Sequence, residues 1–318
     1  MKAFVYETYG SPDVLYAKEI LQPTPRHNEL LIKVHSSSLS AGMNLLREGR
    51  FPGNKLFTLF LRLQFGIFKP KRSILGCEFS GTVEMIGNNV SLFKKGDAVY
   101  GTTTGLKNGA YADYVCVPEK WAHGVIKLKP EQLSFTEAAA LPVGGMTALQ
   151  ILKKVNLSSH SNILIYGASG SVGSYAVQIA KYFGAKVTAV CSTTNVEWIY
   201  SIGADEVIDY TNPDWFMLIK KFDIVFDAVG KLQRSEWKIL LAEGGRFCST
   251  RSLTFEKTVY LAILEKMILE GKLKPVIDKV YPFQEMIEAH RYVDHGHKKG
   301  NVIIDHIAGT SAFYNLIK

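Results

Sequence analysis

The stretch that decides the fold is NILIYGASGSVGSYAVQIAKYFGAKVTAVCSTTN, residues 162–195. A short apolar run ends in a turn of the form Ala168-x-Gly170-x-x-Gly173, and a helix with an apolar period follows at once. Gly170 has no side chain to block a pyrophosphate, Gly173 lets the helix pack closely on the strand, and the helix N-terminus offers N–H groups to anionic oxygens. Although alanine replaces the first glycine of the usual motif, the succession of strand, turn, helix and strand predicts a dinucleotide site.

The end of the second predicted strand bears on the choice between NAD and NADP. NAD sites usually place an acidic residue about twenty residues beyond the turn, where it binds both ribose hydroxyls. Here residues 191–195 read CSTTN, and the first acid is Glu197. Hydroxyls and an amide can donate to a 2′-phosphate that a carboxylate would repel, so we expect NADPH to be preferred. Ser192 and Thr193 could also simply end the strand and cap the next helix.

From about residue 126 the chain alternates long helical windows with short apolar strands. This alternation is typical of a parallel, doubly wound sheet. The expected strands are 162–167, 186–191, 206–210, 223–230 and 244–250, with helices at 135–155 and 255–271. Beyond residue 272 the pattern predicts a strand, a helix and a strand.

Residues 1 to about 125 have a different pattern, in which glycine and proline turns separate short strands. Such a pattern is typical of a compact, antiparallel, barrel-like domain. The strands are expected at 1–7, 29–39, 79–87, 96–101 and 111–118. The chain is therefore predicted to form an α/β protein of two domains.

The composition, 47% hydrophobic and 21% charged, is that of a globular protein with a substantial core. The net charge of +8 suits phosphorylated or carboxylated small molecules, whereas scattered Lys and Arg residues argue against nucleic acid. No secretory signal is expected at the N-terminus.

The four cysteines are far apart and form no CxxC pair, which disfavours a disulfide framework or a zinc knuckle and favours a reducing cytoplasm. They are Cys77, Cys116, Cys191 and Cys248.

The most apolar stretch is LFTLFLRLQFGIF, residues 56–68, which an arginine and a glutamine interrupt. It is too short for a membrane span, so no stable membrane insertion is expected. The stretch could lie on a membrane surface, with Lys69, Lys71 and Arg72 touching anionic lipid. A buried helix, or a hydrophobic lid over a substrate cleft, is the favoured interpretation.

Several segments carry a family resemblance through almost the whole chain. They include KAFVYETYGSPDVL (2–15), NELLIKVHSSSL (28–39), ILGCEFSGTVEMIG (74–87), the stretch from 166 to 193, and EAHRYVDHGHKKGNVII (288–304). In order and spacing they resemble the medium-chain dehydrogenase/reductase superfamily, in particular its zinc-independent, quinone-oxidoreductase-like branch. The resemblance implies a GroES-like antiparallel β-barrel catalytic domain, a Rossmann domain, and a cleft where NADPH meets a carbonyl substrate. The expected limits are 1–125 with 272–318 for the first domain and 126–271 for the second.

The resemblance also bears on zinc, because zinc-dependent relatives have three ligand positions that here hold Ser40, Cys77 and Val143. Only one of these residues could bind zinc, whereas a catalytic zinc needs three protein ligands. No metal is therefore expected, and Cys77 is expected to be a small buried packing residue. Without a Lewis acid, hydride transfer to a quinone or an α,β-unsaturated carbonyl is easier than alcohol oxidation, since hydrogen bonds can stabilise the developing oxygen charge. The expected function is an NADPH-dependent reductase of such small molecules.

By correspondence with the family, four residues would surround the nicotinamide and the substrate: Ser40, Asn44, Arg47 and Thr147. Ser40 or Asn44 is a candidate hydrogen-bond donor to the developing oxyanion, although both could serve only to shape their loop. Met43 replaces an acid that many relatives carry at that position. Tyr111 is another candidate proton source, but its strand pattern suits core packing equally well.

The resemblance further implies a set of cofactor contacts. At the pyrophosphate these are Ala168, Ser169, Gly170, Ser171, Val172 and Gly173. At the ribose and the adenosine they are Ser192, Thr193, Asn195 and Tyr210. The set is completed by Asp227 and Gly230 at the end of a strand, and by Gly300 and Asn301. The two lysines before Gly300 could equally form a solvated turn.

One departure from the family follows residue 250. Only about ten residues, RSLTFEKTVY, separate the strand at 244–250 from the next helix, where relatives usually have a further strand and a loop. A homodimer is therefore possible but could be weakened or absent. Two alternative functions stay open, namely a 2-enoyl thioester reductase and a non-catalytic NADPH-binding sensor.

Overall fold

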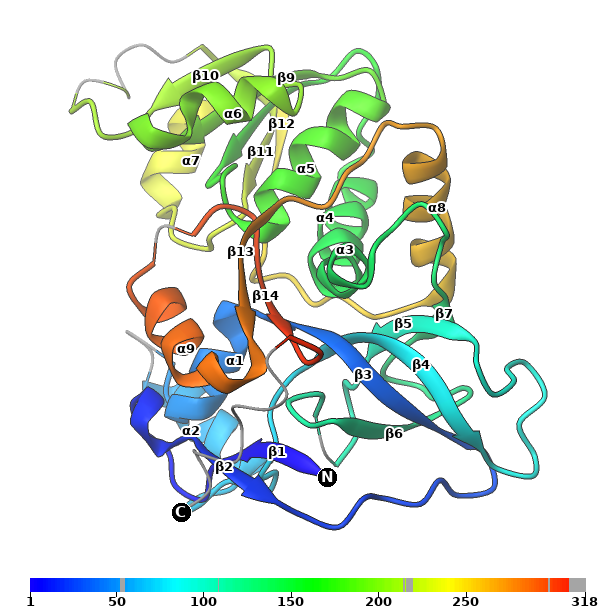
Figure 1. The fold of residues 1–318 in the computed structure, drawn as a ribbon. Coiled ribbons are helices and arrows are strands. Elements are labelled where there is room, and N and C mark those ends of the chain that lie inside the picture. The colour runs from blue at the N-terminus through cyan, green and yellow to red at the C-terminus, as the bar shows by residue number, and fades with distance from the viewer. Residues whose placement is uncertain (52–54, 108, 214, 216–219, 297, 309–318) are drawn as a thin grey trace. The chain divides into compact units, whose positions relative to one another are not determined.

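A computed structural model of the chain describes residues 1–51, 55–107, 109–213, 215, 220–296 and 298–308. The chain forms two compact units (Figure 1). Unit 1 comprises Met1–Pro142, Ile277–His297 and Asn301–Lys318, and unit 2 comprises Val143–Val276 and Lys298–Gly300. The chain therefore leaves unit 1, builds unit 2, and then returns to unit 1.

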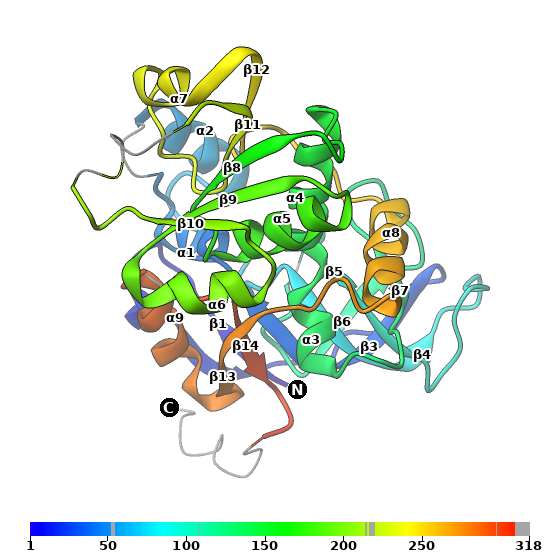
Figure 2. The same cartoon turned by 90° about the horizontal axis from the view of Figure 1, so that it is seen from above.

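Unit 2 contains a five-stranded sheet in the order β10-β9-β8-β11-β12, which Figure 2 shows from one edge to the other. All four strand pairs are parallel. The strands are β8 (Asn162–Tyr166), β9 (Lys186–Cys191), β10 (Glu206–Asp209), β11 (Phe222–Asp227) and β12 (Leu241–Ser249). The helices are α4 (Pro142–Lys154), α5 (Ser171–Tyr182), α6 (Val196–Ser201), α7 (Arg234–Leu240) and α8 (Thr258–Leu269), with a 3-10 turn at Thr193–Asn195. The predicted parallel, doubly wound sheet is confirmed.

The sheet of unit 2 reverses its strand order between β8 and β11. Along the chain the strands run outward from β8 to β10, and the next strand, β11, returns to the other side of β8. In doubly wound sheets, ligands bind outside the carboxyl ends of the strands at such a switch point. The turn after β8 therefore stands where this architecture places a ligand.

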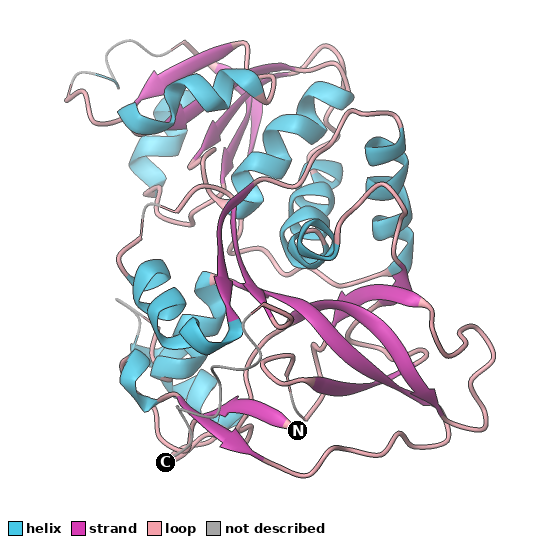
Figure 3. Ribbon diagram, viewed as in Figure 1, coloured by secondary structure: helices cyan, strands magenta, loops and turns pink. Residues whose placement is uncertain are grey.

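Unit 1 contains a seven-stranded sheet, in which every pair is antiparallel except the parallel pair β13–β14. Figure 3 shows its two long strands side by side. The strands are β3 (Glu29–Leu39), β4 (Glu78–Ile86), β5 (Ala98–Thr102), β6 (Tyr114–Pro118), β7 (Ile126–Leu128), β13 (Ile277–Pro282) and β14 (Asn301–Asp305). A separate hairpin joins β1 (Lys2–Val5) and β2 (Tyr16–Glu19). Because β14 pairs with β3, the end of the chain becomes part of the sheet that its beginning forms.

Short helices complete unit 1: α1 (Ala41–Glu48), α2 (Lys55–Phe65), α3 (Phe135–Ala140) and α9 (Met286–Asp294), with 3-10 turns at Pro12–Val14 and Phe283–Glu285. The single helix expected at 135–155 is in fact two, α3 and α4. Ser134 and Glu137 form a capping box at the start of α3. The helix ends before Pro142 because proline has no N–H to continue the ladder. Since α3 contacts β3 and β4, the chain passes to unit 2 only after Pro142, later than the change of sequence pattern near residue 125.

Helix α2 forms from the most apolar stretch. Of the two favoured interpretations, the buried helix is wrong, whereas the lid over a substrate cleft stays a prediction. Leu61 is 7% exposed, whereas Leu56, Leu59 and Phe60 are more than half exposed. One side of the helix therefore packs on unit 1, and the other is open. No helix in the described part of the chain combines the length and the apolar character needed to cross a bilayer.

Candidate functional site

The turn between β8 and α5 has the geometry that its glycines predict. Gly167 has a φ of +77°, and its N–H and that of Ala168 both donate to the Val190 carbonyl, at 3.0 and 3.1 Å. A Cβ built at Gly170 would meet nothing closer than the Gly167 carbonyl oxygen, at 3.6 Å. A Cβ at Gly173 would lie only 2.2 Å from that same oxygen, so the helix can approach the turn this closely only with glycine there. Gly170 therefore leaves open space beside the turn, whereas Gly173 is in close contact with the Gly167 carbonyl.

The first turn of α5 presents backbone donors without protein acceptors. Gly170 precedes the helix and supplies no side-chain cap. In the described part of the chain, no acceptor lies against the N–H groups of Val172 and Gly173. The partial positive charge of a helix N-terminus adds to such donors, and together they fit the diphosphate of a dinucleotide. The half-buried Ser169, Ser171 and Val172 and the buried Ala168 complete the turn.

Gly300 braces this turn within unit 2. Its N–H donates to the Ser169 carbonyl at 2.8 Å, and it forms a parallel bridge with Gly170. Its φ of +57° and the Val276 carbonyl, 2.4 Å from where a Cβ would lie, both favour glycine. The Lys298 ammonium donates to the Gly300 carbonyl, so this lysine helps to hold the segment rather than forming a purely solvated turn. Asn301 follows as a buried residue of β14 in unit 1.

The residues expected at the ribose end lie together after β9, and most of their polar atoms have partners. The Asn195 amide donates to the Ser192 hydroxyl at 2.8 Å and accepts from the Trp198 indole N–H at 2.8 Å. The exposed Thr193 hydroxyl donates to the Asp209 carboxylate at 2.6 Å. Asn195 is buried, so the hydroxyls of Ser192 and Thr193 are the accessible groups.

Asp209 is a residue of this site that the sequence analysis missed. It ends β10 and pairs in register with Cys191, the last residue of β9. Hydrogen bonds from the Thr193 and Thr211 hydroxyls hold the pKa of the Asp209 carboxyl below its ordinary value. The parallel register was the signal that could have revealed it, because the carboxyl ends of neighbouring strands meet at one edge. A carboxylate therefore stands beside the residues on which the NADPH expectation was based.

Tyr210 and Asp227 have partners within unit 2. The half-buried Tyr210 ring lies 6.5 Å from the Tyr166 ring. The buried Asp227 carboxylate accepts from the N–H groups of Val229, Gly230 and Leu232, at 3.0, 2.7 and 2.8 Å. Asp227 therefore shapes the turn after β11, and the turn, including Gly230 at a φ of +77°, is what faces outward.

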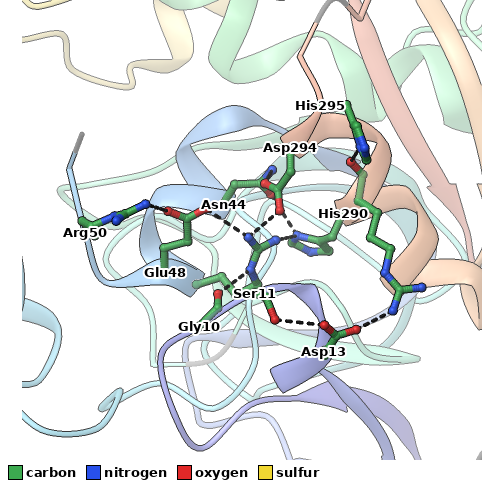
Figure 4. A network of polar contacts seen from close by, with 11 residues as sticks. Gly10, Ser11, Asp13, Asn44, Glu48, Arg50, His290, Asp294 and His295 are labelled. Carbon is green, nitrogen blue, oxygen red and sulfur yellow. Dashed lines mark hydrogen bonds and ion pairs between the residues drawn. The ribbon is translucent and has the colours of Figure 1, made fainter. Parts of the chain in front are cut away.

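Asn44 and Arg47, two of the four expected catalytic residues, are buried on α1 and bind residues of α9 in unit 1. Figure 4 shows Asn44 beside Asp294 and His290. The fully buried Arg47 donates to the Asp294 carboxylate at 2.7 Å, to His290 Nδ1 at 3.0 Å, and to the Gly10 carbonyl at 3.1 Å. The Asn44 amide also donates to Asp294. We call Asn44, Arg47, His290 and Asp294 the α1–α9 cluster. Its contacts occupy both side chains, so the observed role of Asn44 and Arg47 is to fix α1 on α9.

Burial, reinforced by the Arg47 guanidinium, lowers the pKa of His290 to about 3. The imidazole is therefore neutral at physiological pH, and its Nδ1 can accept from Arg47. Tyr111, the other candidate proton source, is fully buried and donates to the Ser38 carbonyl at 3.1 Å. Burial raises the pKa of Tyr111 well above its ordinary value, which suits core packing rather than proton transfer.

Ser40 and Thr147 are the two expected catalytic residues with some exposure. Ser40 is the half-buried residue before α1, and its side chain makes no capping bond. Among the described residues its hydroxyl has no partner. Thr147 is half-buried on α4 of unit 2.

A cavity of about 420 Å³ in unit 1 opens beside α1. Its size is that of small-molecule sites. Apolar side chains and a few polar ones line it, among them Met43, Phe65, Arg72, Cys77, Thr104 and His123. Cys77 packs against the core of unit 1, as expected, but it is only half-buried and also lines this cavity. The sequence analysis missed Thr104 and His123, because loops distant in the sequence bring them to the cavity.

The residues present do not fit a zinc ion. Within the described residues, no group of three or more His, Cys, Asp or Glu side chains is arranged to hold a metal. The neighbour of Cys77, Glu78, is buried and accepts a hydrogen bond from the Ser38 hydroxyl. A serine and a valine stand at the other positions where zinc-dependent relatives have ligands.

Residues 26–129 match the family described as alcohol dehydrogenase GroES-like domain. Residues 171–261 and 257–304 match two families described as zinc-binding dehydrogenase. The GroES-like assignment of unit 1 and the Rossmann-like assignment of unit 2 are therefore confirmed.

Whole-chain relatives agree with these matches. The chain is 35% identical to a 2-methylene-furan-3-one reductase of Solanum lycopersicum, over 96% of this chain and 79% of the relative. It is 33% identical to a chloroplastic NADPH-dependent alkenal/one oxidoreductase of Arabidopsis thaliana, with the same coverage. The solved quinone oxidoreductase of Coxiella burnetii superposes with a TM-score of 0.81 at 28% identity, over 96% of this chain and 99% of that one. The chain therefore belongs to the medium-chain dehydrogenase/reductase superfamily and to its quinone-oxidoreductase-like branch, a family of NAD(P)H-dependent oxidoreductases.

Proposed function

We propose that the chain is an NADPH-dependent, zinc-independent reductase that transfers hydride to a quinone or an α,β-unsaturated carbonyl compound. The observation that carries the proposal is the open turn before α5, with room at Gly170 and with N–H groups at Val172 and Gly173 that have no acceptor among the described residues. The names of the tomato and Arabidopsis relatives, a furanone reductase and an alkenal/one oxidoreductase, support a conjugated carbonyl as the acceptor.

The bound cofactor would supply the hydride, so the chain itself needs mainly to bind and orient. The N–H groups at the start of α5 would hold the diphosphate, with Gly300 keeping the turn in place. The Ser192 hydroxyl, which accepts from the Asn195 amide, would donate to a 2′-phosphate, and the Thr193 hydroxyl would do so only by giving up its hydrogen bond to Asp209. Asp209 opposes that phosphate electrostatically, so the preference for NADPH over NADH should be moderate rather than absolute.

On the substrate side, we propose that the acceptor binds in the cavity beside α1. Met43 lines this cavity one helical turn after Ser40, whose hydroxyl has no partner among the described residues. That hydroxyl is our candidate donor to the oxygen on which negative charge develops. Asn44 and Arg47 would act indirectly, because the α1–α9 cluster positions the helix that carries Ser40. Thr147 remains a proposed contact of the nicotinamide.

The compartment and the assembly remain proposals as well. The four cysteines are free thiols, which supports a reducing compartment such as the cytoplasm. The described sheet of unit 2 ends at β12, an edge strand, and a homodimer formed through that edge is possible.

The test is a titration with NADPH and NADH, followed by a screen of quinones and enones, with a zinc assay on the same sample. We expect saturable NADPH binding, turnover with conjugated acceptors, and no stoichiometric zinc. Ser40→Ala should lower kcat about a hundredfold to a thousandfold while leaving NADPH affinity unchanged. Tight NADPH binding without turnover would instead identify a sensor, and a strong preference for enoyl-CoA would identify a thioester reductase.

A further inference from the structure

The outward side of α2 is apolar, which is unusual for a surface helix. The helix packs inward through Thr58, Leu61, Arg62 and Phe65, at the spacing of one helical face. The opposite side, where a surface helix normally carries polar residues, consists of exposed leucines and phenylalanines together with the exposed Gln64. We call the apolar residues of this side the α2 face: Leu56, Phe57, Leu59, Phe60 and Leu63, which are 79, 46, 54, 59 and 54% exposed.

The apolar surface continues past the end of the helix, where Ile67 and Phe68 are 50 and 91% exposed. This turn is anchored rather than loose. Arg62 donates to the Gly49 carbonyl at 2.8 Å and to the Ile67 carbonyl at 3.0 Å, and its guanidinium lies 4.2 Å from the centre of the Tyr9 ring. The Tyr9 hydroxyl in turn donates to the Gly66 carbonyl at 2.8 Å. The fold therefore holds the apolar side chains outward in a fixed arrangement.

The segment that carries the α2 face, residues 49–77, has charge of a single sign, while the exposed Glu7 of unit 1 lies close enough to Lys69 for its carboxylate to sense that cation. Between Glu48 and Glu78 the sequence contains no acidic residue and six basic ones: Arg50, Lys55, Arg62, Lys69, Lys71 and Arg72. Lys55 is exposed at the start of α2, and Lys69 and Lys71 are exposed just beyond its end. An apolar face flanked by cations is the combination that binds at the boundary between acyl chains and anionic headgroups.

Other occupants fit this surface less well. With 11 residues, α2 is about 16 Å long, roughly half of a bilayer core, so it can lie on a membrane but cannot cross one. A second copy of the chain seated on the same face would bring one cluster of cations against another, which costs electrostatic energy.

We propose that the α2 face and the turn at 66–71 dock this protein on an anionic lipid surface. The apolar side chains enter the headgroup boundary, and Lys55, Lys69 and Lys71 contact the lipid phosphates. The inference does not depend on the proposed reaction, because none of these residues takes part in it.

The test is co-sedimentation with vesicles of phosphatidylcholine alone and of phosphatidylcholine with phosphatidylglycerol. We expect the protein to bind the anionic vesicles at low salt and to be released as salt rises. The triple substitution Leu59→Ser, Phe60→Ser and Leu63→Ser should lower the partition coefficient about tenfold or more. Lys69→Gln with Lys71→Gln should lower it several-fold, and this loss should shrink at high salt.

Matched controls come from exposed positions of unit 2. Leu269→Ser, at a residue 63% exposed on α8, and Lys238→Gln with Lys272→Gln should leave vesicle binding unchanged. Thermal unfolding and turnover of a water-soluble acceptor should also match the wild type in every variant, which excludes misfolding.

Three outcomes would overturn the proposal. The first is a wild-type protein that does not bind anionic vesicles at low salt. The second is a triple variant that still binds them fully. The third is a dimer in solution that the triple substitution dissociates, since the α2 face would then be an interface between two copies.

Discussion

The turn before α5 and two members of the α1–α9 cluster, Asn44 and Arg47, were expected to contact reactants, yet the turn and the cluster are built in different ways. The turn works through the main chain, with open space at Gly170 and a Cβ-free contact at Gly173. The cluster is made of side chains that form hydrogen bonds with one another. The comparison shows that a site made of backbone can be recognised from residue types alone, whereas a polar side chain can be assigned to a site only once its partners are known.

The largest effect is expected in the cluster, for Arg47→Met. This change leaves Asp294 without its cation and the Gly10 carbonyl without a donor, so it should lower the free energy of unfolding by about 3 kcal/mol. Urea unfolding measures this loss. Arg50→Met removes the same charge from a side chain that is 70% exposed and should cost less than about 0.5 kcal/mol. An Arg47→Met protein of full stability but without turnover would mean that the cluster is catalytic. The distinction between a binding turn and a structural cluster would then be wrong.

The next effect should come from two substitutions in the turn. Gly170→Ala fits the protein but fills the space proposed for the diphosphate, so NADPH affinity should fall about tenfold, about 1.4 kcal/mol, without loss of stability. Gly173→Ala pushes a Cβ onto the Gly167 carbonyl and should lower stability and affinity together. Cofactor titration and thermal unfolding on the same samples distinguish the loss of affinity alone from the combined loss of stability and affinity. Wild-type NADPH affinity in Gly170→Ala would exclude this turn as the phosphate site.

Stability should also depend on pH through two buried histidines. Burial lowers the pKa of both His290 and His306 to about 3, with Arg47 and His35 respectively as second causes. Below about pH 6.5 the unfolded chain binds protons that the native state does not, so stability is full above that pH and falls toward pH 3. The slope should reach about 1.4 kcal/mol per pH unit for each histidine. Urea unfolding between pH 7.5 and 5 measures this slope, and His290→Asn should reduce it.

The smallest effect is expected for Asp209, whose carboxylate lies beside Thr193 at the proposed ribose end of the cofactor site. Asp209→Asn removes the charge beside Thr193, so NADPH should gain affinity relative to NADH by a few-fold. Comparing both dissociation constants at low and high salt checks this. Glu197→Gln removes a charge from a neighbouring exposed position on α6 and should change the ratio less. An unchanged ratio in Asp209→Asn would show that the carboxylate does not reach the ribose end.

Local pattern was sufficient for most of the regular structure. The strands at 29–39 and 186–191 were predicted to the residue, because continuous apolar or alternating runs between turn signals leave little choice. The helical window at 135–155 is confirmed except that Pro142 divides it into two helices, because proline interrupts the hydrogen-bond ladder. Of the two interpretations of residues 56–68, the buried helix was wrong, because periodicity cannot say whether a neighbour covers an apolar face.

By itself, the sequence determined the order of strands and helices, the glycine turn with its donors, and the family, because these depend on backbone conformation and short spacings. Only the tertiary structure decided that Asp209 stands beside Thr193, that Arg47 is committed to Asp294, and that the α2 face is open. The first two are contacts between residues 16 and 247 positions apart, and the third is the absence of a covering neighbour among the described residues. Packing in three dimensions creates such relations, and no local pattern encodes them.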